Sequence, residues 1–138
     1  MRLSTTIAAA FAFSISCAAS SAHAQRAQAA MDCAFTGTDF VYDCSIRLSR
    51  GGQPLAGAEI TVGADMPSMP MAHNVKPVKA AAGANPGEYK ARLDLEMSGE
   101  WMVKLRLGGP VRDQLNLLYE FDAKGARPAK RSAAPARK

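Results

Sequence analysis

Apolar and polar residues alternate along four segments of this chain, at residues 40–48, 88–96, 101–107 and 111–121. A period of two residues is the pattern of a β-strand with one face in the core and one in solvent. Shorter and weaker runs of the same kind predict further strands at residues 31–36, 59–63 and 74–79.

The segments between these strands are rich in Gly, Pro, Asn and Asp, which favour turns. Beyond residue 24 the chain shows no convincing helical period. Strands with a single apolar face need a second layer to cover them. The pattern therefore predicts an all-β domain, an immunoglobulin-like antiparallel β-sandwich of about seven short strands.

The first 24 residues have the organisation of a secretory signal. A charged start precedes an apolar run over residues 7–19, and Ala22 and Ala24 supply the small residues of a cleavage site. We expect cleavage after Ala24 and a periplasmic protein. The apolar run is shorter than the roughly 20 residues of a membrane-spanning helix, so no transmembrane anchor is expected.

The cysteines support an exported domain. Cys17 lies within the signal, and Ser14 stands where a lipid-attachment signal has an aliphatic residue, which disfavours a lipoprotein. Cys33 and Cys44 remain, and in an oxidising compartment we expect them to form a disulfide. The alternative, a thiolate metal site, needs a closer spacing. A loop near residue 40 would set the two cysteines opposite each other, so the bond would staple the first hairpin.

The net charge of +5 is unevenly distributed. The predicted domain, residues 25–121, is close to neutral, whereas residues 122–138 are basic and contain no aliphatic residue larger than Ala. Such a segment cannot bury enough apolar surface to fold, so we expect a disordered tail. Nucleic acid is not expected as its partner in an exported protein. Contact with anionic lipid or an acidic protein, or a plain solvated tail, are the alternatives.

The segment 65–74, Asp-Met-Pro-Ser-Met-Pro-Met-Ala-His-Asn, concentrates one kind of chemistry. It contains Met66, Met69, Met71 and His73, which is the only histidine beyond the signal. Thioethers are soft, neutral ligands that select Cu(I), and they form no disulfides under oxidising conditions. Imidazole adds a nitrogen donor. These four residues predict a Cu(I) site, in which an extended chain would place Met69, Met71 and His73 on one side.

Two further residues are candidates to cover the metal. Trp101 and Met102 begin a later strand and are the candidates for a second shell around the metal, with Met102 as a further sulfur donor, although taken alone both are more typical of a core. The competing interpretation is structural: methionines at alternate positions also fill the core of an edge strand.

A resemblance extends over about residues 51–121. The order Asp-Met-Pro-x-Met-Pro-Met-x-His, then Gly-Glu-Tyr-Lys-Ala from Gly87, then Met-Ser-Gly-Glu-Trp from Met97 resembles the YtkA-like and FixH-like domains of bacterial envelope proteins. It implies an immunoglobulin-like sandwich and copper handling beside copper transport or cytochrome oxidase assembly, with Met66, Met69, Met71 and His73 at the motif positions. FixH-like proteins usually carry a membrane anchor, which this sequence is expected to lack, and the two cysteines lie outside the shared part.

The residues for catalysis are missing: we find no nucleophilic Ser elbow, no phosphate-binding Gly loop and no evident carboxylate pair, so an enzyme is not expected. Two hypotheses remain. One is a periplasmic Cu(I) chaperone or copper-resistance factor that passes the ion to an efflux or oxidase-assembly partner. The other is an interaction module that uses the Pro/Met segment as an apolar contact patch for another envelope protein.

Overall fold

The structure, a computed structural model, describes residues 25–130 as an all-β domain. The strands are β1 (Ala27–Phe35), β2 (Val41–Arg50), β3 (Gln53–Pro54), β4 (Glu59–Asp65), β5 (Asn74–Lys79), β6 (Ala81–Ala82), β7 (Glu88–Asp94), β8 (Gly99–Gly108), β9 (Asp113–Asp122) and β10 (Gly125–Pro128). Within these residues there is no helix long and apolar enough to cross a membrane. The signal peptide expected at residues 1–24 lies outside the described residues.

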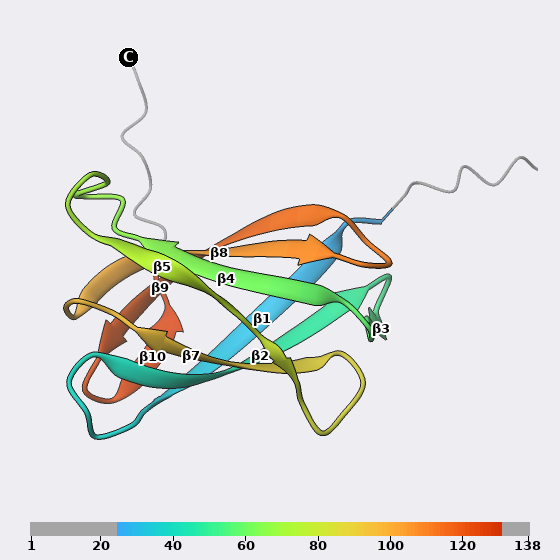
Figure 1. Ribbon diagram of the computed structural model, residues 1–138, viewed down its shortest axis with the longest axis horizontal. Coiled ribbons are helices and arrows are strands. Elements are labelled where there is room, and N and C mark those ends of the chain that lie inside the picture. Colours follow the sequence, from blue (N-terminus) through green and yellow to red (C-terminus); the bar gives the residue numbers. More distant parts are fainter. Residues whose placement is uncertain (1–24, 131–138) are drawn as a thin grey trace, which may run out of the picture.

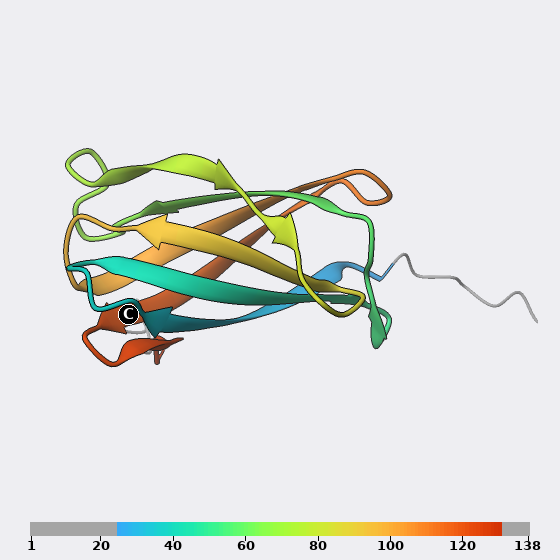
Figure 2. The same cartoon turned by 60° about the horizontal axis from the view of Figure 1, so that its bottom comes forward.

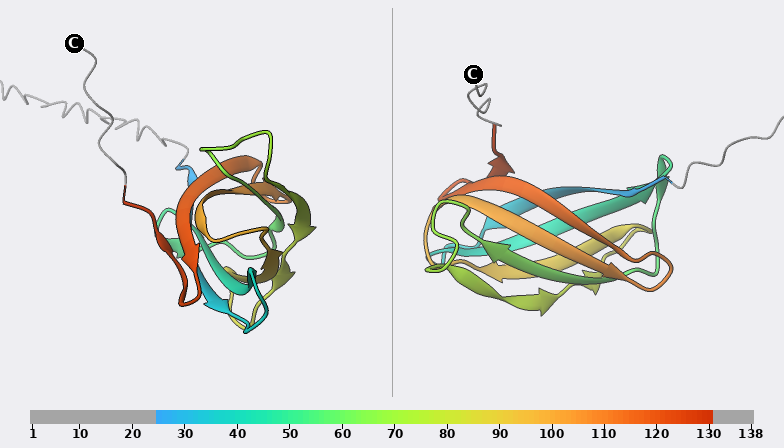
Figure 3. Two further views of the ribbon diagram at one scale, coloured as in Figure 1. Left: turned by 90° about the vertical axis from the view of Figure 1, so that its left-hand side faces the viewer. Right: turned by 90° about the horizontal axis from the view of Figure 1, so that it is seen from above.

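All strands pair antiparallel in one sheet, in the order β5-β4-β8-β9-β10-β1-β2-β7-β6, with β3 beside β2. The sheet curls into a nearly closed barrel (Figures 1 and 2), which is seen almost along its axis in the left view of Figure 3. The prediction of an antiparallel all-β domain is confirmed, and each of the seven expected strands is present. The additional strands β3 and β6 are only two residues long, too short to show alternation.

The core fills the barrel and follows the alternation. Along β8, Trp101, Val103, Leu105 and Leu107 point inward and are buried, while the residues between them lie on the outer wall. Each large apolar side chain buried in this way contributes about 1.5–3 kcal/mol. The largest fully buried side chains are Trp101, Tyr42, Phe121, Ile46, Leu48, Ile60, Leu93, Leu95 and Leu105.

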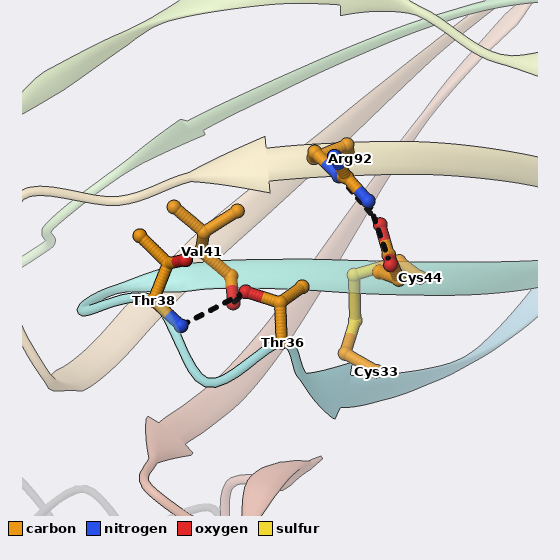
Figure 4. A network of polar contacts seen from close by, with 7 residues as sticks. Cys33, Thr36, Thr38, Val41, Cys44 and Arg92 are labelled. Atoms are coloured by element: carbon orange, nitrogen blue, oxygen red, sulfur yellow. Dashed lines mark hydrogen bonds and ion pairs between the residues drawn. A yellow bond between two sulfur atoms is a disulfide. The ribbon is translucent and has the colours of Figure 1, made fainter.

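The first hairpin is closed covalently (Figure 4). Cys33 on β1 pairs directly with Cys44 on β2, with a Cα–Cα distance of 4.0 Å, and the two form a disulfide. The connection is tightened by Thr36, whose hydroxyl donates to Val41 O at 2.9 Å and accepts from Thr38 N at 3.3 Å. The predicted disulfide is confirmed, and it staples a hairpin as expected.

An ion pair fastens the next strand to this hairpin on the outer wall. Arg92 on β7 donates to both carboxylate oxygens of Asp43 on β2, at 2.7 and 2.9 Å. The hydrogen bond from the Arg92 guanidinium lowers the pKa of Asp43 below its ordinary value. Both side chains are well exposed, so solvent screens the pair and it contributes little to stability.

The domain continues past Phe121, so the expected boundary and the disorder predicted from residue 122 are wrong for the first part of the tail. β10 pairs with β9 and, through Ala126, with Cys33 of β1. Gly125 has φ +118, and a Cβ there would lie 2.5 Å from Cys33 O, so only glycine fits. Backbone pairing places this strand, which has no apolar alternation to reveal it. The end of the tail, residues 131–138, lies outside the described residues.

Candidate metal-binding site

Four connections meet at one end of the barrel, at residues 36–40, 66–73, 95–98 and 123–124. We call this the loop end; it lies at the left in Figure 1. The connection between β4 and β5, residues 66–73, carries the candidate ligands, and we call it the Met/His loop. It is the green loop at the upper left of Figure 1.

The Met/His loop consists of two successive turns. Met69 N donates to Met66 O at 3.0 Å, and Ala72 N donates to Met69 O at 3.1 Å. Pro67 and Pro70 occupy the second position of each turn, where their fixed φ suits the backbone. The extended conformation considered for this segment is therefore wrong, because each Met-Pro step starts a turn.

The base of the loop brings Met66 and His73 together. Asp65 and Asn74 form the last strand pair, and Met66 N donates to His73 O at 3.4 Å one residue further on. Opposite residues of an antiparallel pair project to the same face. Met66 is 5% exposed and belongs to the core, and the His73 side chain is 26% exposed above it.

Two residues of β8, Gly99 and Trp101, lie against Met66 and His73. Gly99 has φ +134, and a Cβ there would meet Met66 Cε at 3.2 Å, so the absence of a side chain gives the thioether its place. Trp101 is fully buried, and its ring contacts the His73 ring edge to face with centroids 6.5 Å apart. Its Nε1 donates to Met97 O at 3.1 Å, which fixes the indole. The structure thus places Trp101 against His73.

Met102 is not at the site. It pairs with Leu118 on β9 and with Asp65 on β4, and it faces the outer wall of the barrel, because strand alternation turns it away from Trp101. The expectation that Met102 lies near the Met/His loop as a sulfur donor is therefore wrong.

The other two methionines of the Met/His loop, Met69 and Met71, face solvent. Met69 is 39% exposed and Met71 is 96% exposed, so the side chain of Met71 makes almost no contact. The structure therefore gathers Met66 and His73 and leaves Met69 and Met71 accessible on the turns above them. Of these three methionines, only Met66 packs in the core as the structural interpretation requires.

One residue of this site, Glu96, was not predicted from the sequence. Glu96 Oε2 forms a hydrogen bond with His73 Nδ1 and links the Met/His loop to the connection between β7 and β8. The alternation over residues 88–96 assigned Glu96 to the polar face of a strand. The strand ends at Asp94, which frees Glu96 to reach the other loop. The only signal in the sequence was its place beside the turn at residues 98–100.

The loop end carries an excess of negative charge. Its connections and the strand residues that border them contain one lysine, Lys124, and the carboxylates Asp39, Asp65, Asp94, Glu96 and Asp122. Asp65 pairs with Lys104 and Asp122 with Arg127, and the others leave a net negative field. Such a field raises the local concentration of small cations.

Hard or thiolate metal sites have little support here. Residues 25–130 contain no group of three or more His, Cys, Asp and Glu side chains placed to hold an ion. The soft donors at the loop end are the thioethers of the Met/His loop, and thioethers select Cu(I) over harder ions such as Mg²⁺.

Fold and site together define a small disulfide-stapled β-domain that presents a methionine- and histidine-bearing loop at one end. The model of the YtkA-like family matches residues 38–106, and the chain belongs to this family. The match begins and ends earlier than the resemblance seen in the sequence, and it includes the Met/His loop, Glu96 and Trp101 but not Cys33. No significant match was found among curated proteins or solved structures.

Proposed function

We propose that this protein binds Cu(I) in the periplasm and serves as a copper chaperone or resistance factor, passing the ion to an efflux or oxidase-assembly partner. The observation that carries the proposal is the Met/His loop. It pairs the inward Met66 with His73 and holds two solvent-facing thioethers, Met69 and Met71, on proline-initiated turns.

The donor types suit Cu(I) and its transfer. Cu(I) accepts three or four soft ligands, and Met66, Met69, Met71 and His73 supply that number. The rigid base keeps the entropy lost on binding small. An exposed, flexible thioether such as Met71 can be exchanged for a ligand of another protein without opening the barrel. The charge of the loop end attracts the cation, and the proposed role involves no catalysis.

The proposal includes the immunoglobulin-like sandwich that the sequence predicts. We take the wall formed by β4, β5, β8 and β9 and the wall formed by β1, β2 and β7 as the two sheets of an immunoglobulin-like sandwich, which β10 joins into one path. Comparison with an experimental structure of a family member tests this correspondence.

The proposal is tested by anaerobic competition with a chromogenic Cu(I) chelator. We expect the chain from Gln25 to withdraw one equivalent of Cu(I), and the variant Met69→Ala/Met71→Ala/His73→Ala to withdraw none while it remains folded. Met102→Leu is the matched control, since Met102 lies on the outer wall, and it should compete like the wild type. A wild-type protein that never competes with the chelator contradicts the proposal.

One observation favours the second candidate, an interaction module. Within the described residues, the exposed large apolar side chains are Phe40 at 37%, Met69 and Met71, and all three lie at the loop end. Phe40 also has φ +62, a conformation that is costly for a bulky residue. Under this alternative the wild type fails to bind Cu(I), and Phe40→Ala weakens binding to a partner as strongly as Met71→Ala does.

A further inference from the structure

Glu96 and His73 form a side-chain hydrogen bond that joins the Met/His loop to the connection between β7 and β8. The imidazole is held on two sides: its Nδ1 meets the carboxylate of Glu96, and its ring packs against Trp101 at 69°. The backbone hydrogen bond from Met66 to His73 O fixes the same residue from below. The contact with Glu96 uses Nδ1, so Nε2 is the nitrogen left to meet a ligand.

We propose that Glu96 is a positioning residue that holds His73 in the tautomer with its proton on Nδ1, so that Nε2 presents its lone pair to the metal. A neutral imidazole has one donor and one acceptor nitrogen, and a carboxylate accepts only from the donor. The same hydrogen bond orients the ring. The claim that Nε2 binds the metal rests on the proposed function. The claim that the proton of His73 lies on Nδ1 does not depend on it.

Glu96 is not itself assigned as a ligand. Its oxygens are hard donors, which suit Mg²⁺, Ca²⁺ or Mn²⁺ better than Cu(I). It also engages the imidazole through Oε2, so its carboxylate is committed to the ring. Its effect on copper must therefore pass through His73, and this separates a positioning role from direct coordination.

The tautomer is measured first, in metal-free protein. In the ¹⁵N-labelled chain from Gln25, His73 is the single histidine, and two-bond ¹H–¹⁵N correlations at mildly alkaline pH identify the protonated nitrogen. We expect the Nδ1–H form in the wild type and a mixture of both forms in Glu96→Ala. A wild-type spectrum that shows the Nε2–H form overturns the inference.

Copper affinity is measured next, in the same proteins. We expect Glu96→Ala to weaken Cu(I) binding by about 10–100-fold, the usual effect of losing such a partner, with Glu96→Gln between it and the wild type because an amide oxygen still accepts from Nδ1. Glu100→Gln is the matched control, an exposed glutamate on β8 opposite Glu120. Unchanged affinity in Glu96→Ala overturns the inference even if the wild type binds copper.

A double-mutant comparison shows whether Glu96 acts through His73. In the His73→Ala background, Glu96→Gln should have no further effect on Cu(I) affinity. An equal loss in both backgrounds contradicts the positioning role. If the wild type has the Nδ1–H form but binds no Cu(I), the proposed function fails and the role of Glu96 in fixing the tautomer stands.

Discussion

Single residues with special backbone requirements shape the candidate site. Pro67 and Pro70 occupy the second positions of the two turns of the Met/His loop. These turns expose Met69 and Met71 to solvent. Gly99 makes room for Met66 at a φ of +134, which L-residues rarely adopt. The arrangement of the thioethers therefore depends on residues that carry no metal-binding group.

The variant Gly99→Ala tests this dependence. It combines a strained φ with a Cβ that meets Met66 Cε at 3.2 Å, whereas Gly52→Ala, at φ +76 with nothing within 4 Å, carries backbone strain alone. Strain of this kind costs about 1–3 kcal/mol. We expect Gly99→Ala to lower the free energy of unfolding more than Gly52→Ala does, as measured by denaturant titration. Equal losses would show that Met66 does not depend on Gly99.

At the scale of elements, alternation in the sequence indicated each of the seven longer strands but not β3, β6 or β10. Two-residue strands show no period, and β10, with the sequence Gly-Ala-Arg-Pro, is placed by backbone pairing and a turn. The candidate site was recognisable from residue types, since three methionines and the only histidine beyond the signal fall within residues 66–73. The geometry of the site could not be predicted, because the hydrogen bond between His73 and Glu96 joins two loops through residues that are 23 apart in the chain.

The first hairpin carries the strongest prediction at this scale. Replacing Cys33 and Cys44 together by Ala removes a crosslink between residues 11 apart. The chain-entropy model gives a loss of about 3 kcal/mol in the free energy of unfolding. Denaturant titration measures this loss, and we expect the barrel to remain folded under native conditions.

The same double variant separates two metal hypotheses. Cys33 and Cys44 lie on β1 and β2, whereas the Met/His loop joins β4 and β5. We therefore expect Cu(I) affinity and stoichiometry to be unchanged in the folded variant. A loss of binding there would point to the cysteine sulfurs and away from the thioethers.

At the scale of the whole molecule, the barrel acts as a support that holds four connections at one end. Its interior is filled by buried apolar side chains, and the candidate ligands stand on the connections at the loop end. The apolar alternation that predicts a strand does not predict which strands become neighbours. For this reason the continuous path through β9, β10 and β1 emerged only with the structure.

The central claim is that thioethers of the Met/His loop bind Cu(I), and X-ray absorption at the copper edge tests it most directly. With selenomethionine in place of methionine, we expect copper–selenium scattering from at least two neighbours together with one nitrogen. A copper shell of nitrogen and oxygen alone, with no selenium neighbour, would contradict the account.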